Sequence, residues 1–484
     1  MDKNINALEP ALVWKYFSEI NRIPRPSKKE KKMVAYLQET GKKLGVETLT
    51  DEVGNVLMRK PATPGKEKVT PIIFQAHMDM VCEKNNDVNF DFEKDAIQTY
   101  IDGEWMKAKG TTLGADDGIG VAMALAILES KDIAHGPVEC LFTVDEETGL
   151  TGANALKKDF LKGKMLLNLD SEDEGQFFIG CAGGKNTEIS IDFDEEDVPT
   201  NGKAFLVTVK GLQGGHSGDD INKNRGNANK IITRVLHEAT FRFDAALASI
   251  DGGNLHNAIA REAQAVIVLD KKEEKAFAEY IRKFDQTVRT ELKTSDSGVK
   301  VELKETAMPA HVIDNYTQCD LVEALYACPH GVLAMDQDIP GFVETSTNLA
   351  SIKMQGKQIK IVTSQRSSIE SKKEDAANMV AATFELMNAD VTFTDGYPGW
   401  APNTDSKVMK LMTQAYKNLF KKEPKVLAIH AGLECGLIGE KYPDMDMISY
   451  GPTMRGVHSP DERLEIKTVK QVWDLTLEFL RLLD

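Results

Sequence analysis

The stretch "PIIFQAHMD" (residues 71–79) is a short apolar run that ends in His77 and Asp79. Two further runs have the same form, "VECLFTVDE" (138–146) and "KMLLNLDSE" (164–172), and both end in acidic residues. Short continuous apolar runs of this kind predict strands that are buried on both faces of a sheet. Because ligands bind beyond the carboxyl ends of the strands in open α/β sheets, we expect the three polar ends to meet in one crevice.

Helical segments alternate with these strands up to about residue 180, which predicts an α/β fold. Between the first two strands, "DDGIGVAMALAILESKD" (116–132) predicts a helix with Asp116 or Asp117 at its N-cap. The small apolar residues of this helix suit packing against a sheet.

The chain has 484 residues, more than one hydrophobic core usually supports, so we expect at least two domains. The pattern changes near "CAGGKN" (181–186) to longer helices and strands, and the first pattern resumes after "GYPGW" (396–400). We therefore predict a catalytic domain made of residues 1–184 and 398–484. An α+β domain, residues 185–397, would be inserted between these two parts.

The composition is that of an ordinary globular enzyme, with 42% hydrophobic and 28% charged residues and no apolar run long enough to span a membrane. The start of the sequence has no export signal, and the six cysteines are widely spaced without a CxxC motif. We therefore expect a cytoplasmic protein with reduced thiols. The net charge of −16 argues against a nucleic-acid partner.

His77 and Asp79 are two residues apart on a predicted strand, so their side chains point the same way. An aspartate in this position can orient a metal-bound imidazole, although the same pattern is common around structural histidines. Other predicted strand ends, a helix start and a late loop add more polar side chains, namely Glu146, Glu147, Asp170, Asp116, Asp117 and His458. So many carboxylates require cations to offset their repulsion. Two Zn²⁺ ions suit such nitrogen and oxygen ligands, and Mn²⁺ or Co²⁺ could occupy the same ligands.

Several competing motifs are absent or incomplete. "HEATF" (237–241) has Phe241 where HExxH requires a second histidine, and "GADDGIG" (114–120) is followed by Met123 where a dinucleotide fingerprint needs glycine. The sequence contains neither a GxxxxGK[ST] phosphate loop nor a GxSxG elbow. These observations argue against gluzincin, nucleotide-dependent and serine hydrolase functions.

Seven motifs together carry a resemblance to a known family. They are, in order, "FQAHMDMV", "TTLGADDGIGVAMALA", "TVDEETGLTGA", "LNLDSEDEG", "GLQGGHSGDDI", "HAGLECG" and "GPTMRGVHSPDE". The chain resembles, over almost its whole length, the cytosolic non-specific (aminoacyl-histidine or β-alanyl-histidine) dipeptidases of the aminoacylase and carboxypeptidase G2-like dizinc peptidases. The resemblance implies a dizinc aminopeptidase-like catalytic domain with a mixed sheet and flanking helices, and an inserted lid and dimerisation domain.

The resemblance also implies a role for each residue of the cluster. His77 and Asp170 would hold one zinc ion, Glu147 and His458 the other, and Asp116 would bridge the two. Family members keep an acid at the first position of the Asp116-Asp117 pair, so Asp117 is expected to cap the helix instead. Asp79 would orient His77. Glu146 would be the general base that takes a proton from a hydroxide-forming water held between the metals.

In the inserted domain, the resemblance implies that His216 of "GGHSG" contacts the tetrahedral oxyanion of the substrate, often in the active site of a partner subunit of a homodimer. Asn257 and Arg366 would also contact the substrate, the arginine by binding its terminal carboxylate. For His430 of "HAGLECG", a role in the pocket and a place in the core remain equally open. The histidines without motif context are expected to be structural or on the surface, namely His135, His237, His256, His311 and His330.

The function implied is metal-dependent hydrolysis of dipeptides, of the Xaa-His type and including β-alanyl-histidine, or more broadly. Two alternatives remain at this point: another hydrolase of the same family, such as an aminotripeptidase or an N-acyl-amino-acid deacylase, and an inactive scaffold. The sequence assigns Asp145, which lies beside the two glutamates, no role beyond shaping the strand end.

Overall fold

The computed structural model describes residues 5–483, which form two compact units. The first unit runs to Gly180 and also includes Pro402–Ala428 and the chain from Leu433 onward. The second unit comprises Cys181–Ala401 and the short segment Ile429–Gly432. That segment was expected in the catalytic domain, but the backbone N–H of Ala182 donates to the carbonyl of Ile429 at 3.0 Å and ties it to the second unit.

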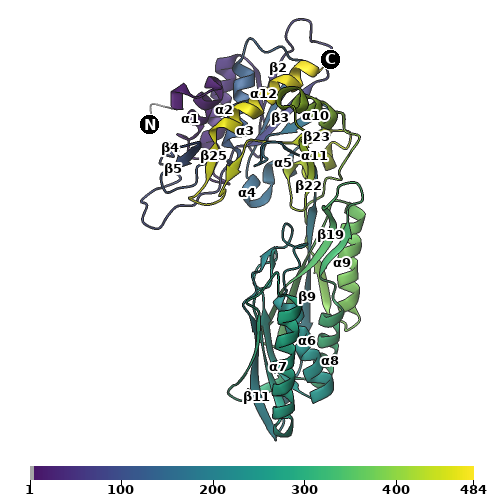
Figure 1. Cartoon of the computed structure of the whole chain (residues 1–484). Coiled ribbons are helices and arrows are strands. Elements are labelled where there is room, and N and C mark those ends of the chain that lie inside the picture. Colours follow the sequence, from purple (N-terminus) through teal and green to yellow (C-terminus); the bar gives the residue numbers. More distant parts are fainter. Residues whose placement is uncertain (1–4, 484) are drawn as a thin grey trace. The chain divides into compact units, whose positions relative to one another are not determined.

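The first unit is built on an eight-stranded mixed sheet (Figure 1). Its strand order is β1 (Glu47–Thr50), β2 (Val56–Lys60), β6 (Val138–Thr143), β3 (Ile72–His77), β7 (Met165–Asn168), β23 (Asp446–Ser449), β8 (Gln176–Cys181) and β22 (Lys425–Ile429). The three strands predicted from the sequence, β3, β6 and β7, are neighbours at the centre, every residue in them is buried, and they run parallel. Their carboxyl ends therefore lie at one edge of the sheet.

Helices flank this sheet, and a second small sheet lies in the same unit. The helices are α1 (Ala11–Ile20), α2 (Lys31–Leu44), α3 (Ala115–Glu129), α10 (Lys407–Phe420), α11 (Glu434–Lys441) and α12 (Ile466–Leu482), with the short η1 (Ile5–Ala7), α4 (Glu146–Gly149) and α5 (Thr151–Ala155). The small sheet has the order β24 (Met454–Arg455), β25 (Arg463–Glu465), β5 (Trp105–Ala108) and β4 (Thr99–Asp102). Helix α3 is buried from Ala115 to Leu128, as its apolar composition requires, and it packs on β3 and α1.

The start of α3 differs from a simple capped helix. Its backbone N-cap is Gly114, and Asp116 and Asp117 both have non-helical φ/ψ angles. The carboxylate of Asp117 accepts the backbone N–H of Gly120 at 3.1 Å, so this side chain caps the regular part of the helix. The irregular first turn leaves the Asp116 side chain available for other contacts.

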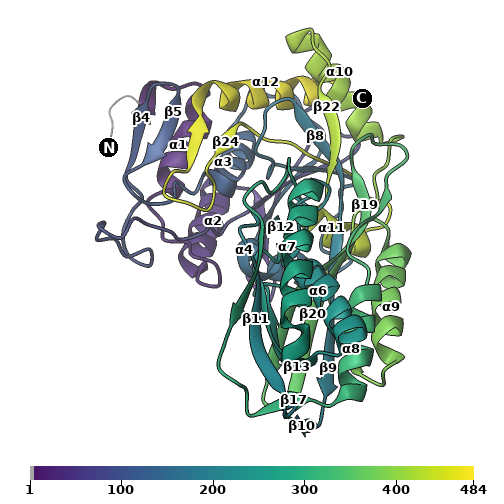
Figure 2. The same cartoon turned by 60° about the horizontal axis from the view of Figure 1, so that its bottom comes forward.

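The second unit is an antiparallel sheet with helices packed on it, and Figure 2 shows α6, α7, α8 and α9 in front of its strands. The strand order is β16 (Lys300–Glu305), β11 (Gly202–Lys210), β15 (Ala263–Asp270), β13 (Ala246–Gly252), β19 (Val343–Gln355), β20 (Gln358–Ser367), β9 (Gly183–Asp192) and β21 (Asp390–Phe393), with β18 (Gly331–Met335) beside β19. The remaining elements are α6 (Ala228–Phe243), α7 (Glu274–Glu291), α8 (Asn315–Ala327), α9 (Glu370–Glu385), η2 (Lys271–Glu273) and the paired strands β10 (Glu195–Asp197) with β17 (His311–Ile313) and β12 (Gly215–His216) with β14 (Ala258–Ile259). One hydrophobic core joins sheet and helices. The predicted combination of an α/β domain and an α+β domain is confirmed.

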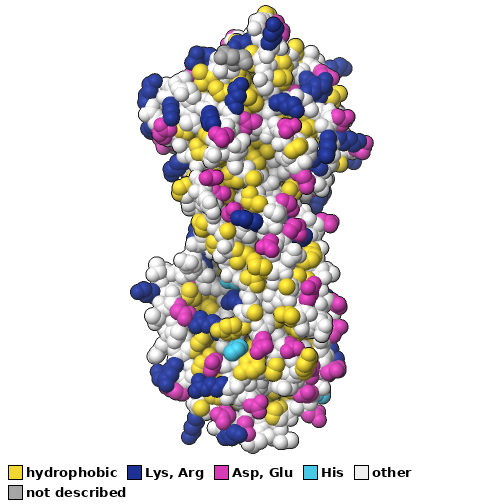
Figure 3. All heavy atoms as spheres, turned by 90° about the vertical axis from the view of Figure 1, so that its right-hand side faces the viewer, with side chains coloured by type: hydrophobic (Ala, Val, Ile, Leu, Met, Phe, Trp, Pro, Cys, Tyr) yellow, Lys and Arg dark blue, Asp and Glu magenta, His cyan; other side chains and the backbone are white. Residues whose placement is uncertain are grey.

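Acidic and basic side chains are interspersed on the face drawn in Figure 3. Across residues 5–483, no helix has the length and apolar character that crossing a membrane would require. None of the six cysteines, all of which lie in this range, forms a disulfide bond.

Candidate active site

The polar residues predicted to meet do so in the first unit, at the carboxyl ends of β3, β6 and β7. His77 is the last residue of β3 and is only 1% exposed, and Asp79 follows it and is fully buried. The first turn of α3 adds Asp116, and the loop between β24 and β25 adds His458. Segments separated by hundreds of residues thus supply one cluster.

Asp116 lies between two histidines, and each of its carboxylate oxygens faces one of them. Oδ1 is 3.0 Å from Nε2 of His77, and Oδ2 is 3.1 Å from Nε2 of His458. Each histidine has one further carboxylate beside the same nitrogen: Asp170 lies 3.4 Å from His77 and Glu147 lies 3.0 Å from His458. Two groups of one histidine and two carboxylates therefore share Asp116.

The spacing in these groups fits a divalent cation. Four ligands at about 2.1 Å around a tetrahedral Zn²⁺ ion are separated from each other by about 3.4 Å. The nitrogen and oxygen atoms facing each other here lie 3.0 to 3.4 Å apart. One oxygen of Glu147 is buried without a hydrogen-bond partner, as expected for an atom that a cation would satisfy.

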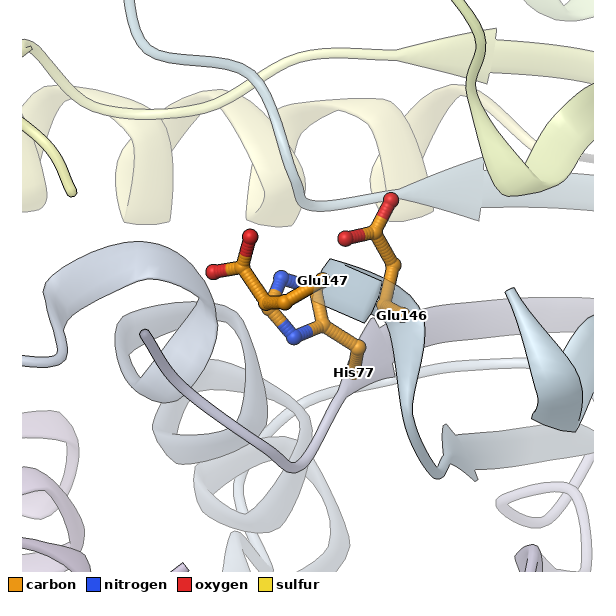
Figure 4. A group of neighbouring side chains, drawn as sticks. All are labelled: His77, Glu146 and Glu147. Atoms are coloured by element: carbon orange, nitrogen blue, oxygen red, sulfur yellow. The ribbon is translucent and has the colours of Figure 1, made fainter. Parts of the chain in front are cut away.

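Glu146 and Glu147 are consecutive residues of the short helix α4, which follows β6. Figure 4 shows both side chains extending to the same side as the imidazole of His77, with their carboxylates diverging. The carboxylate of Glu147 belongs to the group around His458 and Asp116. The carboxylate of Glu146 forms a further group with His77 and Glu147, with ligand atoms within 4.8 Å of one another, but no described contact places it within hydrogen-bonding distance of either histidine.

Asp79 connects His77 to the turn that carries the glutamates. Its Oδ1 atom lies 3.3 Å from Nδ1 of His77 and accepts the backbone N–H of Glu146 at 3.0 Å. Its Oδ2 atom accepts the backbone N–H of Glu147 at 3.3 Å and the hydroxyl of Ser27 at 2.8 Å. Burial alone would raise the pKa of Asp79, but these donors and His77 lower it, so the group is ionised.

The crowding of carboxylates shifts several pKa values. Burial raises the pKa of Asp170 to about 8, and the nearby Asp116 carboxylate adds to this rise. Burial opposes protonation of His77, but the carboxylates of Asp170, Asp116 and Asp79 outweigh it and raise the pKa of His77 well above its usual value. Hydrogen bonds to Asp116 and Glu147 raise the pKa of His458 to about 11. A centre that holds protons this tightly is one where a divalent cation would be held tightly in their place.

Burial also raises the pKa of Glu146 well above its usual value, and the negative charges of Asp170, Glu434 and Glu147 add to the effect. A raised pKa brings a glutamate towards the range in which it both accepts and donates protons near neutral pH. The surroundings of Glu146 therefore suit a general base.

Asp145 has a structural role just after β6, where the sequence suggested only that it shapes the strand end. It adopts a left-handed backbone conformation (φ 50°), and its carboxylate accepts hydrogen bonds from the hydroxyls of Thr148 and Thr151. Its backbone N–H donates to Glu30 at 3.1 Å. Asp145 therefore shapes the turn that presents Glu146 and does not belong to either group that contains Asp116.

Three further buried charged residues lie near the cluster, and the sequence did not predict them. Glu434 is fully buried and accepts hydrogen bonds from Gln75 at 2.6 Å and Thr143 at 2.7 Å, and burial raises its pKa to about 7. The others are Arg25 and Glu462, which hydrogen-bond mainly to backbone groups. Their partners are distant in sequence, so no local motif indicates them.

The second unit has its own cavity of about 430 Å³, lined by His216, Asn257 and Arg366 together with His256 and Tyr397. Arg366 comes from β20 and is 6% exposed. Its guanidinium donates to the Tyr397 hydroxyl at 3.0 Å, and its Nη2 lies 3.5 Å from Nε2 of His216. The three predicted residues thus meet within one chain, and His256, expected to be structural or on the surface, is exposed and lines the same cavity.

The protonation of His216 follows from its neighbours. Its Nδ1 accepts the backbone N–H groups of Gly218 and Asp219, each at 3.2 Å, which assigns the ring proton to Nε2. Burial and the charge of Arg366 lower the pKa of His216, so the neutral form is favoured. The cavity therefore presents two neighbouring donors, Nε2–H and the guanidinium, to an anionic oxygen.

His430 is a core residue of the second unit. It is 6% exposed, and its Nε2 lies 2.7 Å from the Ser346 hydroxyl. Burial lowers its pKa to about 3, so it is neutral. The residues that follow it, Ala431 and Gly432, line the cavity.

The chain is similar to known proteins over nearly its whole length. The chain is 41% identical over 477 residues to the cytosol non-specific dipeptidase of Escherichia coli, covering 99% of this chain and 98% of that protein. Its structure matches that of the aminoacylhistidine dipeptidase of Vibrio alginolyticus with a TM-score of 0.95 and 42% identity, covering 100% of this chain and 99% of the other. A tripeptidase from Staphylococcus aureus shares the fold, with a TM-score of 0.56 and 16% identity over 98% of each chain.

The family described as Peptidase family M20/M25/M40 matches residues 73–481, a range that contains every member of the histidine and carboxylate cluster. The match therefore extends over most of the chain and over both parts of the first unit. This protein belongs to peptidase family M20/M25/M40.

Proposed function

We propose that this protein is a metal-dependent dipeptidase that hydrolyses the peptide bond of dipeptides, Xaa-His dipeptides among them. The observation that carries the proposal is the position of Asp116, whose two oxygens face His77 and His458 at 3.0 and 3.1 Å. The relatives with 41% and 42% identity are a non-specific dipeptidase and an aminoacylhistidine dipeptidase, which supports the same substrate class.

The residues that would hold two metal ions are those of the two groups that share Asp116. His77 and Asp170 would bind one ion, Glu147 and His458 the other, and Asp116 both. We propose Zn²⁺, because imidazole and carboxylate ligands suit it, with Mn²⁺ or Co²⁺ as substitutes. When bound, two such ions lower the pKa of a water and polarise the scissile carbonyl.

Glu146 is the proposed general base. Its carboxylate is largely buried, its pKa is raised, and it lies next to a proposed metal ligand without being one itself. It would take a proton from the attacking water and transfer it to the nitrogen of the departing amine. Asp79 would keep both His77 and the Glu146 turn in place through the contacts of its two oxygens.

The second unit is the proposed lid, and its cavity is the proposed site for the anionic part of the substrate. The Arg366 guanidinium suits the terminal carboxylate, and the Nε2–H of His216 suits the oxyanion that develops during the reaction. Asn257 lines the same cavity as a further polar contact. An anchor for the terminal carboxylate would favour substrates with a free C-terminus.

We also propose a cytoplasmic location and a homodimer formed through the second unit. The location is supported by the relative named as a cytosol enzyme. The dimer is supported by exposed apolar side chains on β18, where Val332, Leu333 and Met335 are 36% to 44% exposed. Sedimentation analysis at several protein concentrations would test the dimer.

The test of the proposed function is a substrate panel on protein of defined metal content. Dipeptides, matching tripeptides and N-acyl amino acids are compared after loading with two equivalents of Zn²⁺ and after treatment with a chelator. We expect dipeptide hydrolysis that disappears with the chelator and returns with the metal. Faster cleavage of tripeptides or N-acyl amino acids would contradict the dipeptidase assignment, and no hydrolysis at all would support a scaffold.

A further inference from the structure

The turn at residues 113–116, which leads into α3 and carries Asp116, is held on one side by a buried carboxylate. Glu462 is 2% exposed, and its side chain accepts hydrogen bonds from four consecutive backbone N–H groups. Oε2 accepts from Leu113 at 2.7 Å and Gly114 at 3.0 Å, and Oε1 accepts from Ala115 at 2.7 Å and Asp116 at 3.4 Å. Both carboxylate oxygens of Glu462 therefore bind this one turn.

A buried cation holds the same turn through its carbonyl group. Arg25 is 1% exposed, and its Nη2 donates to the carbonyl of Gly114 at 2.5 Å. Its Nη1 donates to the carbonyls of Asp79 at 2.7 Å and Met78 at 3.2 Å. Arg25 thus connects the Asp116 turn to the segment that follows His77.

Gly114 is the point where both charged groups meet. Its φ is +67°, and a Cβ atom at this position would lie 2.4 Å from Nη2 of Arg25. A glycine is therefore required both by the backbone conformation and by the close approach of the guanidinium.

Glu462 belongs to the same loop as His458, which lies four residues before it in "HSPDE" (458–462). His458 itself has a left-handed backbone (φ 60°), a conformation that is retained only when the surrounding structure holds it. One carboxylate therefore fixes the backbone on both sides of the short Asp116–His458 contact. In the described contacts, neither Glu462 nor Arg25 hydrogen-bonds to the side chain of a proposed metal ligand, so their role is to place backbone.

We propose that Arg25 and Glu462 are positioning residues that hold Asp116 where it reaches His77 and His458 together, and that this clamp decides whether the second metal position forms. The proposal rests on the proposed two-metal function. The position formed by His77 and Asp170 takes these two ligands from strand ends that Glu462 does not contact, although Arg25 bonds to the carbonyls of Met78 and Asp79 beside His77. The position formed by Glu147 and His458 depends on the Glu462 loop, so it should be more sensitive.

The test is stepwise binding of Zn²⁺ to the full chain, measured by calorimetry with thermal unfolding as a check on folding. Glu462→Gln keeps the size of the side chain but replaces one acceptor oxygen with a donor that faces backbone N–H groups. We expect affinity for the second ion to fall roughly 10- to 100-fold, as for other residues that support metal ligands, while affinity for the first changes less than about threefold. Arg25→Lys, which keeps the charge but cannot reach three carbonyls, should lower affinity for both ions, because Arg25 also bonds to the carbonyls of Met78 and Asp79 beside His77.

Glu139 offers a matched control in the same unit. It is 4% exposed, accepts the backbone N–H groups of Lys162 and Gly163, both at 2.8 Å, and pairs with Arg59 at 2.7 Å. Glu139→Gln should leave both binding steps unchanged. An equal loss of second-ion affinity in this control would overturn the clamp, because the effect would then reflect general destabilisation.

Two other outcomes separate the clamp from the function on which it rests. If the wild-type chain binds two ions and Glu462→Gln and Arg25→Lys bind both with wild-type affinity, the clamp is wrong and the two-metal function stands. If the wild-type chain binds fewer than two ions, the two-metal function fails, and the clamp fails with it.

Discussion

The Oδ1 atom of Asp79 accepts the backbone N–H of Glu146 at 3.0 Å and at the same time lies 3.3 Å from Nδ1 of His77. One buried carboxylate therefore fixes the orientation of a proposed metal ligand and the position of the proposed general base. The two functions are linked because β3 and β6 are neighbouring parallel strands, which end at the same edge of the sheet.

Asp79→Asn should weaken metal binding and hydrolysis together. The amide keeps the shape of the side chain but removes the charge that favours the Nδ1–H form of His77, and we expect metal affinity to fall roughly 10- to 100-fold. Zinc titration with a competing chelator measures this. Asp51→Asn is the control and should leave metal affinity unchanged. Asp51 also accepts backbone N–H groups, from Gly54 and Asn55, but it belongs to none of the residue groups that could hold a metal ion.

Glu146→Gln should retain the metal and lose turnover. The amide cannot accept a proton, and loss of a general base typically reduces kcat about 10²- to 10⁴-fold. Metal content and dipeptide hydrolysis are measured on the same preparation. Glu147→Gln, the neighbouring change, should instead release metal. A zinc-loaded Glu146→Gln protein with wild-type kcat would show that another group is the base.

Metal affinity and the stability of the chelator-treated protein should depend on pH in opposite directions. Folding raises the pKa of His458 to about 11 and that of Asp170 to about 8. A group whose pKa is raised by folding stabilises the protein below its unfolded pKa, and this contribution is lost as pH rises through the folded value. The Tm of chelator-treated protein should therefore decrease between about pH 6 and pH 9.

Zinc must displace the protons from His77 and His458, so its affinity should increase over the same pH range. The increase in Tm on adding zinc is the measurement, made at each pH against the chelator-treated sample. A zinc-induced shift that shrinks as pH rises would contradict the assignment of these histidines as ligands.

Arg366→Ala should mainly raise KM for dipeptides with a free carboxylate. Loss of a charge-assisted hydrogen bond costs about 1.5 to 3 kcal/mol, or roughly 10- to 100-fold in KM. Steady-state kinetics with a dipeptide and its C-terminal amide measure the effect. The wild-type enzyme should prefer the acid, and Arg366→Ala should lose that preference.

Tyr397→Phe, which removes only the hydroxyl bonded to Arg366 at 3.0 Å, should have a smaller effect in the same direction. If Arg366→Ala kept the full preference for the free acid, the carboxylate would be bound elsewhere.

The central strands and the residues at their ends were predictable because each is indicated by a short, continuous stretch of sequence. The alternation expected for a strand over residues 71–79 predicts that His77 and Asp79 point to one side, and three apolar runs of strand length end in polar residues. The separate surroundings of Glu146 and Glu147 were expected only from family resemblance, and the structure explains them by the sharp turn that Asp145 shapes.

Other features depend on contacts that no local pattern records. Glu462 binds a turn 346 to 349 residues earlier in the chain, and Glu434 binds Gln75 from a distance of 359 residues. The segment Ile429–Gly432 joins the second unit although its neighbours on both sides belong to the first. A single Glu or Gly in a sequence does not indicate which distant backbone groups it will contact in the folded chain.

Residue identity and the periods of strands and helices were enough to predict which side chains could bind metal and move protons, because they fix the chemistry and the direction of each side chain. Three relationships appear first in the folded chain: Asp116 faces both histidines, Arg366 and His216 share a cavity, and Arg25 and Glu462 hold the Asp116 turn. They depend on packing because burial brings distant backbone groups and charges together without water between them.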